Sequence, residues 1–145
     1  MKYSAILFSL LLSGLLSGCA IFDPSVEVVK TLSRMNQAYQ NKELDTFMSY
    51  VSPKYQGKRD DFKIAVENDF AGFTEVEYRT SVFQTTIDKE TGDYQASVYY
   101  FRTARSPRYG IDNQSGEIVL TFSRDGKRLK LVKMPNPPLY GLIVP

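Results

Sequence analysis

The chain has 145 residues and carries 18 lysine and arginine residues against 16 aspartate and glutamate residues, a formal net charge of +2. This length suits one domain with its own core, and a charge so close to zero argues against a nucleic-acid partner. The sequence has no histidine and one cysteine, Cys19, which excludes Ser–His and Cys–His nucleophilic catalysis, ordinary zinc sites and an intramolecular disulfide.

The first 19 residues have the pattern of an export signal. Lys2 supplies a positive charge, residues 5–16 form an uncharged apolar run, and Leu16-Ser17-Gly18-Cys19 follows. This tetrapeptide resembles the lipobox of bacterial lipoprotein precursors. The resemblance implies a signal peptide over residues 1–18, cleavage between Gly18 and Cys19, and lipidation of Cys19. The alternative is an ordinary secretory signal followed by an incidental thiol.

The predicted anchor also indicates a location. Two or more acyl chains on one residue hold a protein stably on a bilayer, whereas a single chain binds only marginally. Ala20 follows Cys19 in place of the aspartate that resembles an inner-membrane retention signal. We therefore expect residues 19–22 to be a lipidated tether at the periplasmic face of the outer membrane.

Helical patterns dominate the first half of the predicted domain, which spans residues 23–134. Asp23 suits the N-cap and Pro24 the first helical position, and an apolar stripe then continues to about Asn41. A short second helix is predicted over 44–51 and ends before Pro53. Asp60 is predicted to cap a third helix. The apolar residues of the first and third helices are Val28, Leu32, Met35, Tyr39, Phe62, Val66, Phe70 and Phe73.

Strand patterns follow. Residues 75–87 and 94–103 are predicted to pair through a turn at 88–93, and residues 104–115 are expected to be a looser connection. Asp125-Gly126 is a strong two-residue turn signal, and it predicts a hairpin with Phe122 opposite Leu129 and Leu120 opposite Leu131. The whole order predicts an α+β fold with three N-terminal helices packed on a curved four-stranded antiparallel sheet.

Within this order, the segments 41–47 (NKELDTF) and 51–55 (VSPKY) resemble the nuclear transport factor 2-like (NTF2-like; cystatin-like, SnoaL-like) superfamily. The resemblance implies a cone between helices and sheet. Enzymes of the superfamily such as ketosteroid isomerase pair an aspartate base with hydrogen-bond donors there. The donors that this implies are Tyr78, Tyr99 and Tyr100, and the bases are Asp45, Glu75 and Glu77. Asp60-Asp61 could suggest a metal pair, but a helix N-terminus explains both acids.

Two further segments are candidates for contact with a partner. Residues 99–109 interleave aromatic residues with arginines, and Arg102, Arg105, Arg108 and Tyr109 could bind an anionic glycan, a lipid head group or an envelope protein. The alternative is that these aromatics pack on the sheet with solvated arginines around them. The tail, residues 135–145, is rich in proline and then apolar. It is expected to pack in cis over the helices or sheet, or else to add a strand to a partner.

These patterns lead to an expected function. We expect a membrane-anchored envelope lipoprotein with a non-catalytic binding or scaffolding domain, which is not an enzyme and has no cofactor, metal site or catalytic residue. Its expected partners are the bilayer, through Cys19, and an envelope protein or anionic glycan or lipid. One alternative is an adaptor that docks an anionic envelope component or an assembly machine through a basic face. Another is an enzyme with a tyrosine and carboxylate site in the cone.

Overall fold

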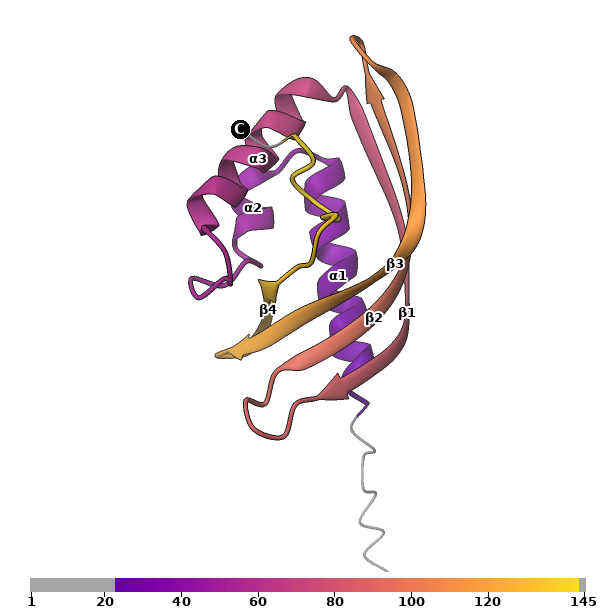
Figure 1. Ribbon diagram of the computed structural model, residues 1–145. Coiled ribbons are helices and arrows are strands. Elements are labelled where there is room, and N and C mark those ends of the chain that lie inside the picture. The colour runs from indigo at the N-terminus through magenta and orange to yellow at the C-terminus, as the bar shows by residue number, and fades with distance from the viewer. Residues whose placement is uncertain (1–22, 144–145) are drawn as a thin grey trace, which may run out of the picture.

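The computed structural model describes residues 23–143, so the predicted signal peptide (1–18), the tether (19–22), Gly18 and Cys19 lie outside the described residues (Figure 1). The elements are α1 (Pro24–Gln40), α2 (Leu44–Met48), α3 (Arg59–Gly72), β1 (Glu75–Ile87), β2 (Tyr94–Ser106), β3 (Gly110–Asp125) and β4 (Arg128–Lys133). All strand pairs are antiparallel, in the order β1-β2-β3-β4. The predicted α+β fold is confirmed. Between residues 23 and 143, no helix is long and apolar enough to cross a membrane.

The helices begin where local chemistry favours them, with one exception. The Asp23 side chain accepts a hydrogen bond from the Ser25 backbone N–H at 2.9 Å, so Asp23 is the N-cap of α1 as predicted. The prediction that Asp60 caps α3 is wrong, because the N-cap is Lys58 and no side chain caps that end. Asp60 and Asp61 lie in the first turn instead, where negative charge is favourable beside the positive end of the helix dipole.

The connection predicted at 104–115 is wrong, because both strands continue through it. β2 runs to Ser106 and β3 starts at Gly110, with Ala104 opposite Asp112. The Thr103 hydroxyl donates to Asn113 Oδ1 at 2.8 Å across this pair of strands. The result is a long β2–β3 ribbon, with β1 paired along the other side of β2 as far as Arg105, and its tip extends beyond the helices at the top of Figure 1.

The last hairpin forms with a register different from the predicted one. Asp125 lies opposite Arg128, so Gly126 and Lys127 form the loop and Phe122 pairs with Leu131 instead of Leu129. Gly126 has φ +61, and a two-residue loop with positive φ at its first residue only matches a type II′ turn, which requires glycine there. The predicted apolar face survives the shift, since its residues are all buried: Ile118, Leu120, Phe122, Leu129 and Leu131.

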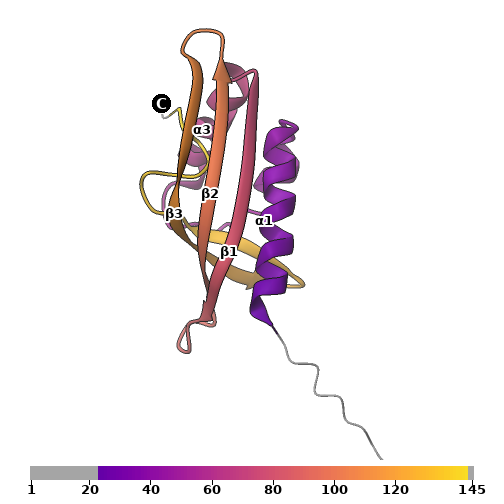
Figure 2. The ribbon, with the colours of Figure 1, turned by 90° about the vertical axis from the view of Figure 1, so that its right-hand side faces the viewer.

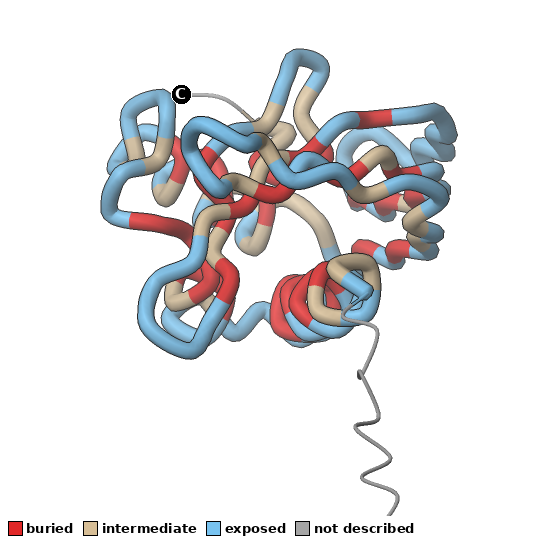
Figure 3. Tube along the Cα trace, turned by 90° about the horizontal axis from the view of Figure 1, so that it is seen from below, coloured by how far each residue is buried: buried red, intermediate tan, exposed pale blue. Residues whose placement is uncertain are grey.

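The sheet curves around the helices, and the last described segment of the chain lies between them. α1 lies beside β1, and α3 lies behind the sheet in Figure 2. Figure 3 shows α1 nearly end-on, with its buried residues turned toward the rest of the domain. After β4 the chain turns back between α3 and the sheet, drawn in yellow in Figure 1. Leu139 and Tyr140 of this segment are fully buried, so the tail packs in cis within the core. We call residues 135–143 the C-terminal strap.

Candidate functional site

A buried carboxylate lies at the centre of the cone between helices and sheet. Asp69 is on the apolar side of α3, seven residues after Phe62 and three after Val66, and it is fully buried. Helical spacing of three and seven residues places side chains on the same face, so α3 turns Asp69 inward with its apolar neighbours. The Tyr39 hydroxyl of α1 donates a hydrogen bond to Asp69 Oδ2. The pair joins the first and third helices within the core.

The strap supplies the other partners of this pair. The Leu142 backbone N–H donates to Asp69 Oδ2 at 2.8 Å, and the Ile143 N–H donates to Oδ1 at 2.7 Å. The Gly141 N–H donates to the Tyr39 hydroxyl at 2.9 Å. The carboxylate is therefore held by one phenol and two backbone amides, a donor set that can stabilise negative charge in the absence of water.

Two further donors converge on a single carbonyl oxygen of the strap. The Tyr78 hydroxyl, from β1, donates to the Leu139 carbonyl at 2.9 Å, and Arg102 Nη1, from β2, donates to the same oxygen at 3.3 Å. Arg102 is buried, and its Nη2 donates to Gln114 Oε1 at 2.7 Å. A phenol and a guanidinium aimed at one carbonyl oxygen form an arrangement that can polarise a carbonyl group.

Burial sets the protonation of these groups. It raises the pKa of the Asp69 carboxyl above its ordinary value of 3.8, and the hydrogen bonds from the strap and Tyr39 and the charge of Arg102 counter this rise only in part. Burial likewise raises the pKa of Tyr39 and of Tyr78 well above 10.0. Both phenols are therefore neutral donors, and Asp69 is the group whose charge can change under ordinary conditions.

The raised pKa of Asp69 predicts a pH dependence of stability. A carboxyl whose pKa is higher in the folded state than in the unfolded state contributes stability that is fully present below the unfolded value, near 3.8, and is lost as the pH rises through the folded value. We expect the unfolding free energy of the wild type, minus that of Asp69→Asn, to fall as the pH rises above the ordinary value of 3.8. Urea unfolding at several pH values measures it. A difference that grows with pH would show that the hydrogen bonds to the carboxylate outweigh its desolvation.

Aromatic rings enclose the strap residue next to the shared carbonyl. The Tyr140 ring centroid lies 5.1 Å from that of Tyr39, 5.0 Å from that of Phe47 and 5.1 Å from that of Tyr78. The Tyr140 hydroxyl donates to Asn36 Oδ1 at 2.5 Å. This position in the cone therefore favours an aromatic ring that carries a polar group at its far end.

Two cavities flank the strap. One, of about 290 Å³, lies against α3 and is lined in part by Tyr55, Phe62 and Pro138. The other, of about 410 Å³, lies toward the β2–β3 ribbon and is lined in part by Arg102, Gln114 and the same Pro138. The strap therefore forms a wall between two cavities on opposite sides of it.

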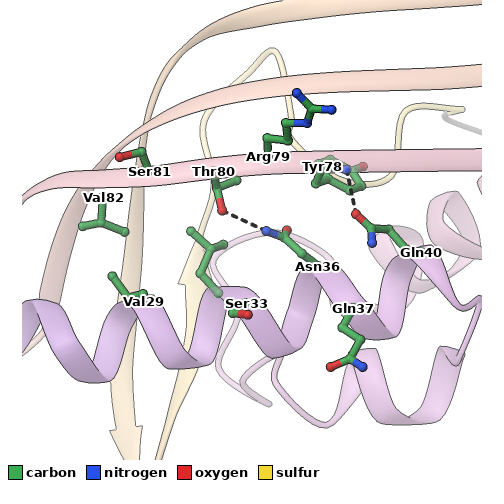
Figure 4. Close-up of a pocket in the computed structure, with 11 residues that line it drawn as sticks. Val29, Ser33, Asn36, Gln37, Gln40, Tyr78, Arg79, Thr80, Ser81 and Val82 are labelled. Carbon is green, nitrogen blue, oxygen red and sulfur yellow. Dashed lines mark hydrogen bonds between the residues drawn. The ribbon is translucent and has the colours of Figure 1, made fainter.

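A third cavity, a groove of about 630 Å³, lies outside the cone between α1 and β1 (Figure 4). There the Asn36 amide donates to Thr80 Oγ1 at 2.9 Å, and the Tyr78 backbone N–H donates to Gln40 Oε1 at 2.7 Å, as the dashed lines show. No carboxylate lines this groove within the part of the chain that the structure describes. The described residues that line the groove therefore include no carboxylate that could act as a general base.

Of the residues implied by the superfamily resemblance, only Tyr78 donates a hydrogen bond within this site. Tyr99 lies on the outer face, stacked on Phe83 at 4.2 Å, and Tyr100 is half-buried. The carboxylates of Asp45, Glu75 and Glu77 are on exposed residues. One sequence signal could have indicated Asp69, the carboxylate of the site. It is an acidic residue at the same helical spacing as Phe62 and Val66, which point into the core. Among residues 23–143, no group of three acids or cysteines is arranged to hold a metal ion.

The four residues predicted to contact a partner do not form one surface. Arg102 is buried beneath the strap, so the prediction that it lies on an exposed partner-binding surface is wrong. Arg105 forms an ion pair with Glu75 at 2.9 Å, and Arg108 lies over the ring of Tyr109 at 5.2 Å. Tyr109 is 75% exposed. Alternating strand residues point to opposite faces, which separates Arg102 from Arg105. Contact of the other three residues with a partner stays a prediction.

Comparison with known proteins identifies the fold. No protein-family model and no curated protein matches the chain. A candidate scytalone dehydratase from Novosphingobium aromaticivorans is similar in structure, with a TM-score of 0.66 and 10% identity over 76% of this chain and 80% of that chain. A candidate aromatic ring hydroxylase from the same species has a TM-score of 0.67 and 11% identity over 75% and 84% of the two chains. A candidate dehydratase of the NTF2-like family from Streptomyces avermitilis has a TM-score of 0.63 and 10% identity over 76% and 92%.

The fold is therefore NTF2-like, as the sequence segments indicated. The same structures correct the expected function. They are named as candidate dehydratases and a hydroxylase, which overturns the prediction of a non-catalytic binding or scaffolding domain and the prediction that the protein is not an enzyme. At identities of 10 and 11% the likeness establishes the fold alone, so the chemistry must be argued from the cone.

Proposed function

We propose that the protein is an enzyme that uses acid–base chemistry in its cone to remove water from a small β-hydroxy carbonyl compound. One observation carries the proposal: a single carbonyl oxygen, that of Leu139, accepts hydrogen bonds from both Tyr78 and Arg102. In a substrate complex, the substrate's carbonyl takes this place. The carboxylate of Asp69, at present bound to the amides of Leu142 and Ile143, then faces the carbon chain of the substrate.

The reaction follows from the roles of these groups. The Asp69 carboxylate removes a proton from the carbon next to the carbonyl, and the electron pair of that C–H bond moves toward the carbonyl oxygen. Tyr78 and Arg102 stabilise the negative charge that develops there. The electron pair then returns from the oxygen and forms a carbon–carbon double bond as the C–O bond to the β-hydroxyl breaks, and protonated Asp69 gives its proton to the leaving hydroxide, which departs as water. Burial favours this use of Asp69, because it raises the pKa of the carboxyl toward that of a useful proton carrier.

The first step can be tested without knowing the natural substrate. In D₂O, an enzyme that removes the proton next to a carbonyl replaces that proton with deuterium, and proton NMR follows the exchange. The rings of Tyr39, Phe47 and Tyr78 around the site favour small aromatic ketones as probes. Acceleration by the wild type over buffer supports the proposal. The same rate in wild type and Asp69→Asn would contradict it.

We also propose that this enzyme is held at the cell envelope by acylated Cys19, on the periplasmic face of the outer membrane. The support is the sequence Leu16-Ser17-Gly18-Cys19 after an apolar run. We expect Cys19→Ser to move the protein from the membrane pellet to the soluble fraction or to leave it unprocessed, and to abolish labelling with a fatty-acid analogue in a bacterial host. Ser13→Ala, which leaves the lipobox intact, is the control. Labelling that persists in Cys19→Ser would contradict the anchor.

A further inference from the structure

The strap makes every polar contact that the proposed substrate would make. Its Leu139 carbonyl accepts hydrogen bonds from the Tyr78 hydroxyl and the Arg102 guanidinium. Its backbone amides at Leu142 and Ile143 donate hydrogen bonds to the Asp69 carboxylate. All of these contacts use the strap's backbone, so the cone groups recognise carbonyl oxygens and N–H donors in general. A ligand with similar groups can compete for the same positions.

Space in the cone is also divided by the strap. The cavities of about 290 Å³ and about 410 Å³ share Pro138 in their lining, and each also includes residues from the end of the strap. Gly141 borders the first cavity and Leu142 the second. Displacing the strap would join them into one space that reaches Asp69 and Arg102, whereas neither is large when the strap is in place.

From these contacts we infer that the C-terminal strap is an exchangeable occupant of the catalytic cone, which keeps the enzyme closed until a ligand displaces it. The inference rests on the proposed function for the identity of the site, and it adds how access to that site is regulated. The occupant belongs to the same chain, so closure needs no partner. Substrates must compete with a segment that is always close by.

The way the strap is bound allows it to open without unfolding the domain. Residues 135–143 belong to no helix or strand, so their release breaks no ladder of the sheet. The last two described residues, Leu142 and Ile143, are only half-buried. Opening must also expose the buried Leu139 and Tyr140, but segments outside the strand ladder can still open locally, at a lower free energy than the core strands.

Gly141 gives a variant that perturbs the strap and its contact with Tyr39, whose hydroxyl accepts a hydrogen bond from the Gly141 N–H. Its φ is +69, and an added Cβ would lie 3.1 Å from Phe62 Cε2 and 3.2 Å from Ala65 Cβ. Gly92, in the β1–β2 turn, has φ +74 and no atom within 4 Å of an added Cβ. Gly141→Ala and Gly92→Ala therefore impose the same kind of backbone strain, but only the first pushes the strap away from α3.

Amide hydrogen exchange by the full chain tests the opening directly. We expect the Leu142 and Ile143 amides of the wild type to exchange at least about tenfold faster than that of Val98, which lies in the inner strand β2. Gly141→Ala should accelerate the strap amides by a further factor of about ten relative to Val98, and Gly92→Ala should not. Strap amides as well protected as Val98 in both the wild type and Gly141→Ala would overturn the inference, because the strap would then open only with global unfolding.

Deuterium exchange into aromatic ketones separates this inference from the proposed function. If the strap closes the cone, Gly141→Ala accelerates ketone exchange several-fold over the wild type, Gly92→Ala does not, and a synthetic peptide of residues 135–145 reverses the gain. Faster strap amides with an unchanged ketone rate would overturn the regulatory role. Faster strap amides with no ketone exchange in any variant would support an exchangeable strap and contradict the proposed enzyme.

Discussion

Replacing Asp69 with asparagine is expected to lower the rate of deuterium exchange into aromatic ketones by about 10²- to 10⁴-fold, the usual contribution of a positioned general base. The amide has nearly the same shape as the carboxylate and can still accept a hydrogen bond from the strap, but it cannot accept a proton. NMR rates for wild type and Asp69→Asn at equal protein concentration measure the effect.

Two other variants separate loss of the base from loss of the fold. Asp45→Asn makes the same chemical change at an exposed position in α2 and should leave the rate unchanged. Tyr78→Phe removes only the hydroxyl that donates to the Leu139 carbonyl, and it should slow the exchange while the circular dichroism spectrum stays that of the wild type. A folded Asp69→Asn protein with the wild-type rate would refute the role of this carboxylate.

Tyr140→Ala is expected to have the largest effect on stability, a loss of about 3–5 kcal/mol in the free energy of unfolding. The side chain is fully buried, its ring meets those of Tyr39, Phe47 and Tyr78, and its hydroxyl bonds to Asn36. Alanine would leave a cavity and an unpaired amide oxygen. Because a domain is stable by only about 5–15 kcal/mol, the variant should unfold at much lower urea concentration.

The exposed Tyr109 supplies the matched control. It is 75% exposed at the tip of the β2–β3 ribbon, and Tyr109→Ala should change the free energy of unfolding by no more than about 0.5 kcal/mol. Urea titration followed by circular dichroism compares the two variants. Equal unfolding midpoints for Tyr140→Ala and Tyr109→Ala would show that the strap contributes nothing to the core.

The fold could be predicted from the sequence because its signals are local. The Asp23-Pro24 start, the apolar stripe of α1 and the alternation in the last hairpin each fix one element. The hairpin register was wrong because it depends on which residue of the turn takes a positive φ, and Gly126 takes the first position of the loop rather than the second.

The site depends on contacts that no local pattern records. Tyr39 and Asp69 are 30 residues apart, and Asp69 meets Leu142 from 73 residues away. The arginine of the site, Arg102, was predicted on an exposed basic face, and only the alternation of β2 about the sheet turns it inward. Tyr78 could be named from the superfamily resemblance, but its hydroxyl partner belongs to the strap.

The ribbon formed by β2 and β3 also bears on how the protein behaves at high concentration. β4 pairs with β3 only from Thr121 onward, so within residues 23–143 no strand lies along the other side of Gly110–Leu120. An unpaired strand edge can pair with a second molecule and start a fibril. This edge carries Asp112, Asn113 and Gln114. Their side chains are charged or strongly hydrated, and aspartate and asparagine are poor β-formers. The same polar residues that made this segment look like a loop thus disfavour pairing of this edge with a second molecule.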